Sequence, residues 1–331
     1  METLMTWGIE LIVALQRIPG LTAAMQLFSQ LGTEEFFLIV MPAIYWCVNA
    51  RLGAGLAVAL ITSNALNGLL KMALHLPRPY WVDTRVRALS SETSYGLPSG
   101  HAQNAMAVWG YLASQVARVR PALAWGLALG LIFLISLSRV YLGMHFPTDV
   151  VGGWVVGAAL LWAVWRWQAP VTEWLKRQSL AQQVLVAVLV AAVYVALAAG
   201  ALALAGGSVD AGAWATNAAA TQAEPIAPRS PNGLASAGGM ILGLGVGLAL
   251  AHRWARFEAG GPWGKRVARF VIGAVGLLLF WRGLALVFPD DPLALALALR
   301  YVRYALTALW AIFLAPWVFV KVGLAERESM R

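Results

Sequence analysis

Two histidines and one aspartate in this chain have the residue types and the spacing of a nucleophile, a carboxylate that orients it, and a proton donor. His145 precedes Asp149 by four residues, and Pro147 between them marks the expected start of a helix. The spacing lets the carboxylate accept a hydrogen bond from Nδ1–H of His145, which leaves Nε2 unprotonated and nucleophilic. His101 is the second histidine, and its ordinary pKa of about 6.5 suits proton transfer to a leaving oxygen.

Three cations accompany these groups, each at the end of an apolar segment. Lys71 and Arg78 lie in the string KMALHLPRP, and Arg139 lies in SRVYLGMHFPTD. Lysine offers a point charge, whereas the guanidinium fork of arginine can bind two phosphate oxygens at once. Pro77 and Pro79 stiffen the chain around Arg78. Fixed cations here indicate an anion site, and the alternative is that they are interfacial side chains that extend to the lipid headgroups.

The string Pro98-Ser99-Gly100-His101 begins another apolar segment. A serine at the N-cap and a glycine in the first turn leave backbone N–H groups free to bind an anion, which the helix dipole also attracts. The segment therefore predicts a small phosphate cradle. Two ordinary explanations remain open: Ser99 is a plain helix cap, and Asp149 complements the dipole of its own helix, a contribution of about 0.3–1 kcal/mol.

Other polar residues near these strings have more ordinary interpretations. His75 lies one helical turn beyond Lys71, where packing at the membrane interface is the expected role. Asp83 and Glu92 fall in the loop between the first two strings, where carboxylates can contact a substrate headgroup but usually only solvate a loop. The Ala-, Pro- and Ser-rich loop 206–232 is either a lid or a flexible connector.

The elements that must position these residues are membrane helices. Of the 331 residues, 60% are hydrophobic and only 12% are charged, about half of the charged share of an ordinary soluble domain. The 32 glycines allow close helix packing in lipid. In a membrane protein, a net charge of +9 more often reflects basic residues that set the topology than a surface that binds nucleic acid. No nucleic-acid partner is therefore expected. The single cysteine, Cys47, excludes an intrachain disulfide.

Nine apolar segments predict an all-α, polytopic membrane helical bundle. Their approximate cores are residues 35–50, 52–75, 99–117, 121–140, 148–168, 180–205, 234–252, 267–287 and 295–320. Residues 1–16 lack the basic stretch of a cleaved signal peptide and are expected to form an interfacial or partly inserted helix. Residues 1–33 as a whole are assigned to an N-terminal interfacial helical segment.

The basic residues indicate how this bundle is oriented. If the nine segments alternate, one side collects a set of cations that includes Arg51, Arg166, Lys176, Arg253 and Lys265. The positive-inside rule makes that side cytoplasmic. All three polar strings then lie on the extracytoplasmic side. We expect a multi-pass protein of a bacterial cell membrane, the bacterial origin being suggested only by the general character of the sequence.

Together the three strings resemble the signature of the type 2 phosphatidic acid phosphatase superfamily. Lys71–Pro79 matches K-x6-RP, Pro98–His101 matches PSGH, and Ser138–Asp149 matches SR-x5-H-x3-D. The resemblance implies a six-helix-type phosphatase core over residues 34–170, with additional transmembrane helices over 171–331 for which no motif suggests a function. The contexts LGTEEFFLIVMPAIYWCVN and SETSYGLPSGHAQ are similar to long-chain-base phosphate and dolichyl diphosphate phosphatases, and the span count is similar to that of glucose-6-phosphatases.

The resemblance also implies a role for each residue. His145 attacks phosphorus to form a phosphohistidine, Asp149 orients it, and His101 protonates the leaving group and then activates water. The phosphoryl oxygens are held by Lys71, Arg78, Ser99, Gly100 and Arg139. This agrees with the general requirement of phosphoryl transfer for positioning and charge stabilisation. No metal or other cofactor is implied.

The implied activity is hydrolysis of a lipid phosphate monoester or diphosphate, with inorganic phosphate as product. The candidate substrates are an isoprenoid diphosphate such as undecaprenyl diphosphate, a phospholipid phosphate and a sphingoid-base phosphate. A transporter or channel for an anionic lipid or solute is the alternative, because many spans and a basic pocket also fit transport. The set of His101, His145 and Asp149 favours the enzyme, since transport needs cations but no nucleophile. The sequence does not indicate the oligomeric state.

Overall fold

The computed structural model describes residues 2–117, 120–206, 210–221 and 223–328, and these are almost entirely helical or in short connections. The expected loop 206–232 and the expected C-terminal region 171–331 each include some residues outside the described ranges. The only pairing of extended backbone within the described ranges is an isolated antiparallel bridge between Phe257 and Arg327.

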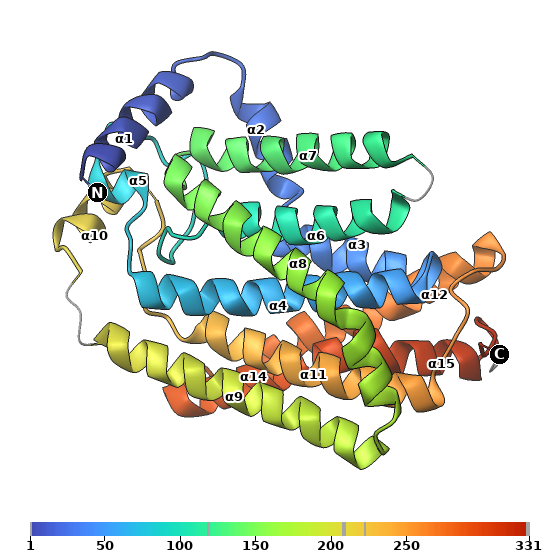
Figure 1. Cartoon of the computed structure of the whole chain (residues 1–331). Helices are drawn as coiled ribbons and strands as arrows, with labels where there is room; N and C mark the ends of the chain where they lie inside the picture. The colour runs from blue at the N-terminus through green and yellow to red at the C-terminus, as the bar shows by residue number, and fades with distance from the viewer. Residues whose placement is uncertain (1, 118–119, 207–209, 222, 329–331) are drawn as a thin grey trace. The chain divides into compact units, whose positions relative to one another are not determined.

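Fifteen α-helices and two π-helical segments make up the described part of the chain (Figure 1). They are α1 (Glu2–Gln16), α2 (Thr22–Gln30), α3 (Glu34–Cys47), α4 (Ala50–Leu74), α5 (Pro79–Val82), α6 (Gly100–Val116), α7 (Pro121–Tyr141), α8 (Pro147–Lys176), α9 (Leu180–Gly206), α10 (Ala213–Ala220), α11 (Asn232–Trp254), α12 (Trp263–Leu278), η1 (Leu279–Gly283), α13 (Leu284–Val287), α14 (Leu293–Leu309), η2 (Trp310–Leu314) and α15 (Ala315–Lys321).

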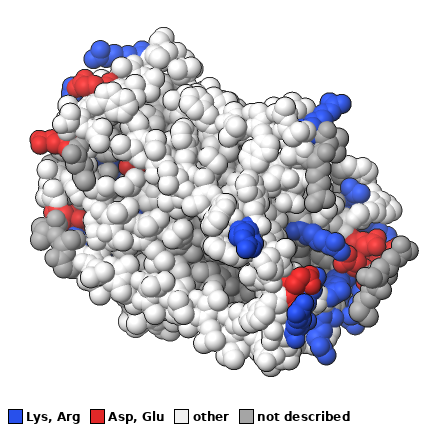
Figure 2. All heavy atoms as spheres, in the orientation of Figure 1, with Lys and Arg blue, Asp and Glu red and all other residues white. Residues whose placement is uncertain are grey.

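Seven helical segments of the described chain are long and apolar enough to cross a membrane, or eight if the bent pair α2–α3 forms one span. The remaining expected span corresponds to α6, which has 17 residues. The prediction of about nine spans in an all-α bundle is therefore consistent with the structure, and the chain is a multi-pass membrane protein. On α9, large apolar side chains such as Leu185, Leu189 and Val193 are exposed, as expected where a helix faces lipid. Figure 2 shows a mostly uncharged face, with acidic and basic residues in small patches.

The helices divide into two compact units. The first unit contains Met1–Phe36, Leu66–Val164 and Ala199–Ser230, and the second contains Phe37–Ala65, Trp165–Ala198 and Pro231–Arg331. All the residues that the sequence analysis assigns to a phosphate site belong to the first unit.

In the first unit, α6 packs against α7 and comes into close contact with α8 (Figure 1). Two glycines of α8 make its close contact with α6 possible. A Cβ atom at Gly153 would lie 2.6 Å from the carbonyl oxygen of Ser99, and one at Gly157 would lie 2.6 Å from that of Gln103. The backbone N–H of Ser99 donates to the carbonyl of Asp149 (2.9 Å). The beginnings of α6 and α8 are therefore held side by side.

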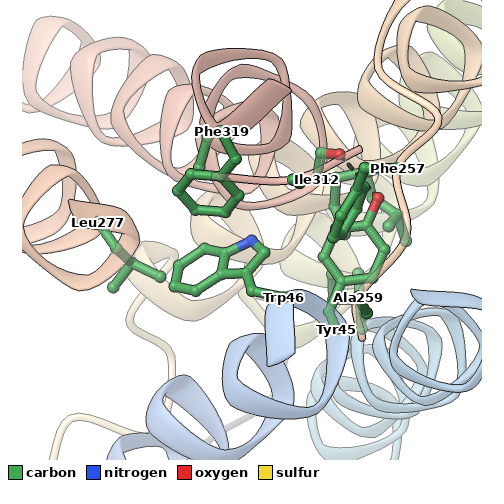
Figure 3. Packing of buried hydrophobic residues seen from close by; sticks show 11 residues of the cluster. Tyr45, Trp46, Phe257, Ala259, Leu277, Ile312 and Phe319 are labelled. Atoms are coloured by element: carbon green, nitrogen blue, oxygen red, sulfur yellow. Dashed lines mark hydrogen bonds between the residues drawn. The ribbon is translucent and has the colours of Figure 1, made fainter. Parts of the chain in front are cut away.

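The second unit has its own core, which Figure 3 shows from close by. The indole of Trp46 meets the ring of Phe319 edge to face, with 5.9 Å between the ring centroids, and donates to the carbonyl of Ala311 (2.8 Å). Tyr45 packs against Phe257 and donates to the carbonyl of Ile312 (2.9 Å). Both buried polar groups thus find a partner, as an apolar core requires.

Candidate active site

Prolines and a glycine set the backbone on which the first and third strings lie. The helix α4 ends at Leu74 shortly before Pro77 and Pro79, which disfavour helical backbone in the residues that precede them. Arg78, between these prolines, has extended backbone at the N-cap of α5. After α7, the chain turns at Gly143, whose φ of +76° favours glycine. The backbone N–H of His145 then donates to the carbonyl of Arg139 (3.2 Å), so the histidine folds back over the end of α7.

The imidazole of His145 is buried between a carboxylate and a guanidinium. Its Nδ1 lies 3.3 Å from Oδ2 of Asp149, and its Nε2 lies 3.2 Å from Nη1 of Arg78. A guanidinium only donates, so Nε2 must accept and Nδ1 must carry the proton that it donates to Asp149. Burial and the positive charges of Arg78, Lys71 and Arg139 hold the pKa of His145 well below its usual value. The ring is therefore neutral near pH 7, and Nε2 carries no proton.

Arg78 is completely buried, and backbone carbonyl oxygens fix its orientation. Its Nε donates to the carbonyl of Ser94 (2.6 Å), its Nη1 to that of Met144 (3.0 Å), and its Nη2 to that of Tyr95 (3.1 Å). The hydroxyl of Ser94 accepts from Nη2 of Arg78 (3.1 Å) and from Nζ of Lys71 (2.9 Å). The two cations of the first string are therefore held by one short stretch of the loop that follows it.

Glu92 bridges the two arginines and was missed by the sequence analysis, which gave loop solvation as its usual role. One carboxylate oxygen accepts from Nη2 of Arg139 (2.8 Å), and the other lies 3.4 Å from Nη2 of Arg78. Burial would raise the pKa of Glu92, but Arg78, Arg139 and Lys71 outweigh that effect and hold the pKa well below its usual range. Glu92 is thus an ionised counter-ion. The signal in the sequence was the excess of cations, which needs a partner in a low-dielectric site.

Three polar atoms from the predicted site residues are buried and have no hydrogen-bond partner: Oγ of Ser99, Nε2 of His101 and Nε of Arg139. Buried polar atoms are nearly always paired in folded proteins, so these three atoms are available to a polar ligand. Ser99 is the N-cap residue of α6, yet its side chain makes no capping hydrogen bond. The explanation of Ser99 as a plain helix cap is therefore wrong. His101 lies within electrostatic range of Arg139, Glu92 and Lys71.

Gly100 is in close contact with α4. A Cβ atom there would lie 3.2 Å from Oδ1 of Asn67, whose amide donates to the carbonyl of Pro98 (3.1 Å) and to Oε1 of Gln103 (2.9 Å). Asn67 thus joins the first string's helix to the second string. No motif identified it, because a lone asparagine in an apolar segment has no distinctive spacing.

The N-terminal segment also contacts predicted site residues, which the sequence analysis did not anticipate. Oγ of Ser29, on α2, accepts from Nη1 of Arg139 (2.6 Å). A Cβ atom at Gly32 would lie 2.7 Å from Cδ2 of His101. The segment that was expected to be interfacial therefore lies against both the arginine of the third string and the histidine of the second.

The remaining candidates lie around this cluster. The ring of His75 meets the ring of Tyr95 edge to face, with 5.2 Å between centroids, and Asp83 pairs with Arg85 (2.8 Å). No group of three or more His, Cys, Asp or Glu side chains within the described ranges is arranged to hold a metal ion. The charges available to a phosphate in this cluster are those of Lys71 and the two arginines of the strings.

Comparisons with known proteins agree with the pattern of the strings. Residues 52–173 match the family model described as "PAP2 superfamily", and residues 235–327 match that of "PAP2 superfamily phosphatase, transmembrane extension". The chain is 29% identical to glucose-6-phosphatase 3 of Mus musculus, over 100% of this chain and 99% of that relative. It is 32% identical to phosphatidylglycerophosphatase B of Bacillus subtilis, over 45% of this chain and 75% of the relative. It is 31% identical to sphingosine-1-phosphate phosphatase 2 of Mus musculus, over 40% of this chain and 38% of the relative.

Proposed function

Because this chain belongs to the PAP2 superfamily of phosphatases, we propose that it hydrolyses a lipid phosphate monoester or diphosphate through a phosphohistidine on His145. The observation that carries the proposal is the placement of His145 between Asp149 and Arg78. That placement supplies an unprotonated Nε2 with a fixed orientation beside a cation that binds phosphate. Each of these properties is required of a nucleophile at phosphorus.

In the first step, the lone pair of Nε2 of His145 attacks phosphorus, and the bond from phosphorus to the leaving oxygen breaks. His101 gives its proton to that oxygen, so an alcohol or a phosphate departs in a stable form. Arg78 donates to Nε2 in the structure. A phosphate oxygen replaces Nε2 as the acceptor for this N–H when the substrate binds.

In the second step, water attacks the phosphorus of the phosphohistidine. His101 accepts a proton from the water, the bond from phosphorus to Nε2 breaks, and inorganic phosphate leaves. His145 returns to its starting form because Asp149 keeps the proton of the imidazole on Nδ1 throughout.

Lys71, Arg78 and Arg139 bind the phosphoryl oxygens, together with the hydroxyl of Ser99 and the backbone of Gly100. Lys71, Arg78 and Arg139 outnumber the nearby carboxylates of Glu92 and Asp149. Such a balance favours an anion and stabilises the charge that spreads over the equatorial oxygens in the transition state. These side chains provide the positive charge for which many phosphatases use a metal, so the proposed mechanism needs none.

An apolar cavity beside the site supports a substrate with a hydrocarbon chain. It has a volume of about 190 Å³ and is lined by Leu4, Met5, Leu76 and Leu97, together with Thr148 and Asp149. An isoprenoid diphosphate, a phospholipid phosphate and a sphingoid-base phosphate all join a charged head to an apolar tail. We infer that the site lies on the extracytoplasmic side, because in the expected topology the basic residues collect at the opposite helix ends. The general character of the sequence suggests that the membrane is that of a bacterial cell.

Phosphate release from purified protein in detergent tests this function. The substrate panel is an isoprenoid diphosphate, phosphatidic acid, phosphatidylglycerol phosphate, sphingosine phosphate and glucose 6-phosphate, and we expect the four lipids to be preferred. In parallel, rapid quenching with labelled substrate detects the phosphoenzyme, which is acid-labile and base-stable if phosphate is on histidine. His145→Ala abolishes both turnover and the phosphoenzyme in our proposal. Turnover retained in that variant, with a normal unfolding temperature, would overturn the mechanism.

A further inference from the structure

We propose that the strap, defined as the described residues 210–221 and 223–230, holds Tyr95 through the ion pair of Asp210 and Arg229 and thereby positions Arg78 to bind phosphate. The strap joins α9 to α11 and includes α10. Tyr95, Asp210 and Arg229 are then positioning residues for the proposed phosphatase reaction, on which this inference rests.

The side chain of Tyr95 is fully buried, and its hydroxyl is held at both of its hydrogen-bonding positions. Nε of Arg229 lies 3.1 Å from the hydroxyl oxygen, and Oδ1 of Asp210 lies 2.9 Å from it. Arginine only donates, so the hydroxyl accepts from Arg229 and gives its own proton to Asp210. The two strap residues also pair with each other, with 3.1 Å between Nη2 and Oδ2. Three groups therefore fix one another.

The backbone of the same tyrosine is in contact with Arg78. The carbonyl of Tyr95 accepts from Nη2 of Arg78 (3.1 Å), and the carbonyl of Ser94 accepts from Nε (2.6 Å). The next residue, Gly96, donates from its backbone to Leu76 (2.8 Å). A displacement of Tyr95 would thus move two of the acceptors that orient the guanidinium.

The strap contacts the chain between Arg78 and Tyr95 at two further points. The backbone N–H of Ala227 donates to the carbonyl of Thr93 (3.0 Å). The side chain of Asn217, on α10, donates to the carbonyl of Trp81 (2.9 Å), and the rings of Trp214 and Trp81 lie 5.9 Å apart between centroids. These contacts hold the chain that follows Arg78 at Trp81 and at Thr93, in addition to Tyr95. The described residues of the strap therefore do more than join two helices.

In this proposal the strap affects catalysis through the position of Arg78 and does not itself contact phosphate. An error of about 1 Å in the placement of a substrate-binding group can lower the rate about 100-fold. The strap residues contact Tyr95, and Tyr95 contacts Arg78 through its backbone. Loss of the strap contact is therefore expected to reduce phosphate binding and turnover together, and only while Arg78 is present.

The test uses full-length Tyr95→Phe and Asp210→Asn, with Glu224→Gln as the matched control. Glu224 is an exposed carboxylate of the same strap. We measure kcat, KM and the dissociation constant of orthovanadate, which mimics the transferred phosphoryl group. We expect kcat/KM and vanadate affinity to fall about 10- to 100-fold in the two variants, with the control unchanged. Tyr95→Phe keeps the buried ring, so it tests the inference even if Asp210→Asn does not fold.

A second background separates positioning from a general structural role. In Arg78→Lys, adding Tyr95→Phe is expected to change vanadate affinity less than twofold, because the group that the strap positions is gone. A full, additive effect in that background would overturn the inference, as would normal vanadate affinity in Tyr95→Phe alone. If the wild-type protein binds vanadate but hydrolyses none of the lipid phosphates, the proposed function fails while the strap is still tested by vanadate binding.

Discussion

Replacing Glu92 with glutamine removes the charge between two buried arginines and keeps the shape of the side chain. The carboxylate accepts from Arg139 at 2.8 Å and lies 3.4 Å from a donor of Arg78. Glutamine keeps one acceptor oxygen and puts an NH2 donor in place of the other, so the variant loses one contact with an arginine. A hydrogen bond to a charged group contributes about 1.5–3 kcal/mol. The longer second contact and the 26% exposure of the Glu92 side chain reduce the total. We expect a loss of about 1–2 kcal/mol in the free energy of unfolding.

The same free energy holds the arginines in the orientation that they need in the transition state. If this stabilisation of about 1–2 kcal/mol is lost completely in the transition state, kcat falls about 5- to 30-fold. Phosphate binding is expected to respond in the opposite direction. The substitution raises the net charge around the site by one, and inorganic phosphate therefore inhibits the variant at a lower concentration than it inhibits the wild type.

The assay measures kcat, the inhibition constant of phosphate and thermal unfolding for Glu92→Gln and for the control Glu10→Gln. Glu10 pairs with Arg85 at 2.9 Å, but both side chains are more than half exposed, and such surface pairs contribute little. The control is therefore expected to match the wild type. A Glu92→Gln protein with normal kcat and normal phosphate inhibition would refute the assignment of Glu92 as the residue that positions the arginines.

The remaining predictions concern the proposed nucleophile and the source of positive charge. Asp149→Asn is expected to lower kcat about 10²- to 10⁴-fold without abolishing it, because Oδ2 accepts from both His145 and the backbone of Phe146; a rate near that of the wild type would contradict this role. In pH profiles, kcat/KM is expected to stay level down to about pH 6.5 and to fall only as pH drops through the lowered pKa of His145, whereas a midpoint above pH 7 would exclude a neutral His145. The unfolded chain takes up that proton at about pH 6.5, so stability to denaturant falls as pH drops below that value. EDTA is expected to change activity less than twofold, and loss that added divalent metal restores would contradict the metal-free mechanism.

The contact between His145 and Asp149 was predictable from the sequence because their spacing is local. His145 and Asp149 are four residues apart, so the beginning of one helix suffices to bring them together. Membrane spans were predictable for a similar reason, since composition over about 20 residues decides whether a helix can cross lipid. The stiff segment around Pro77 and Pro79 was also predictable, because proline restricts the backbone at its own position.

Contacts between distant segments were not predictable in this way. Glu92 and Arg139 are 47 residues apart, and Ser29 and Arg139 are 110 apart. Neither acceptor has a neighbour in the sequence that reveals its partner. Gly32 is likewise one glycine among 32 until the fold brings it against His101. For Ser99 the sequence predicted a phosphate cradle and left plain helix capping open as the alternative, and the missing capping bond argues against that alternative.

The position of Glu92 also explains how a membrane protein can keep three cations together before substrate binds. Two arginines are at most 2% exposed, and cations in so dry a place would repel each other and lose hydration unless a carboxylate balanced them. A carboxylate offers two oxygens with nearly the geometry of two phosphate oxygens. The arginines that Glu92 holds are therefore already oriented toward an oxyanion, and little reorganisation is needed when a phosphoryl group arrives. On this basis Glu92 stabilises the resting site and prepares it for the transition state through the same two contacts.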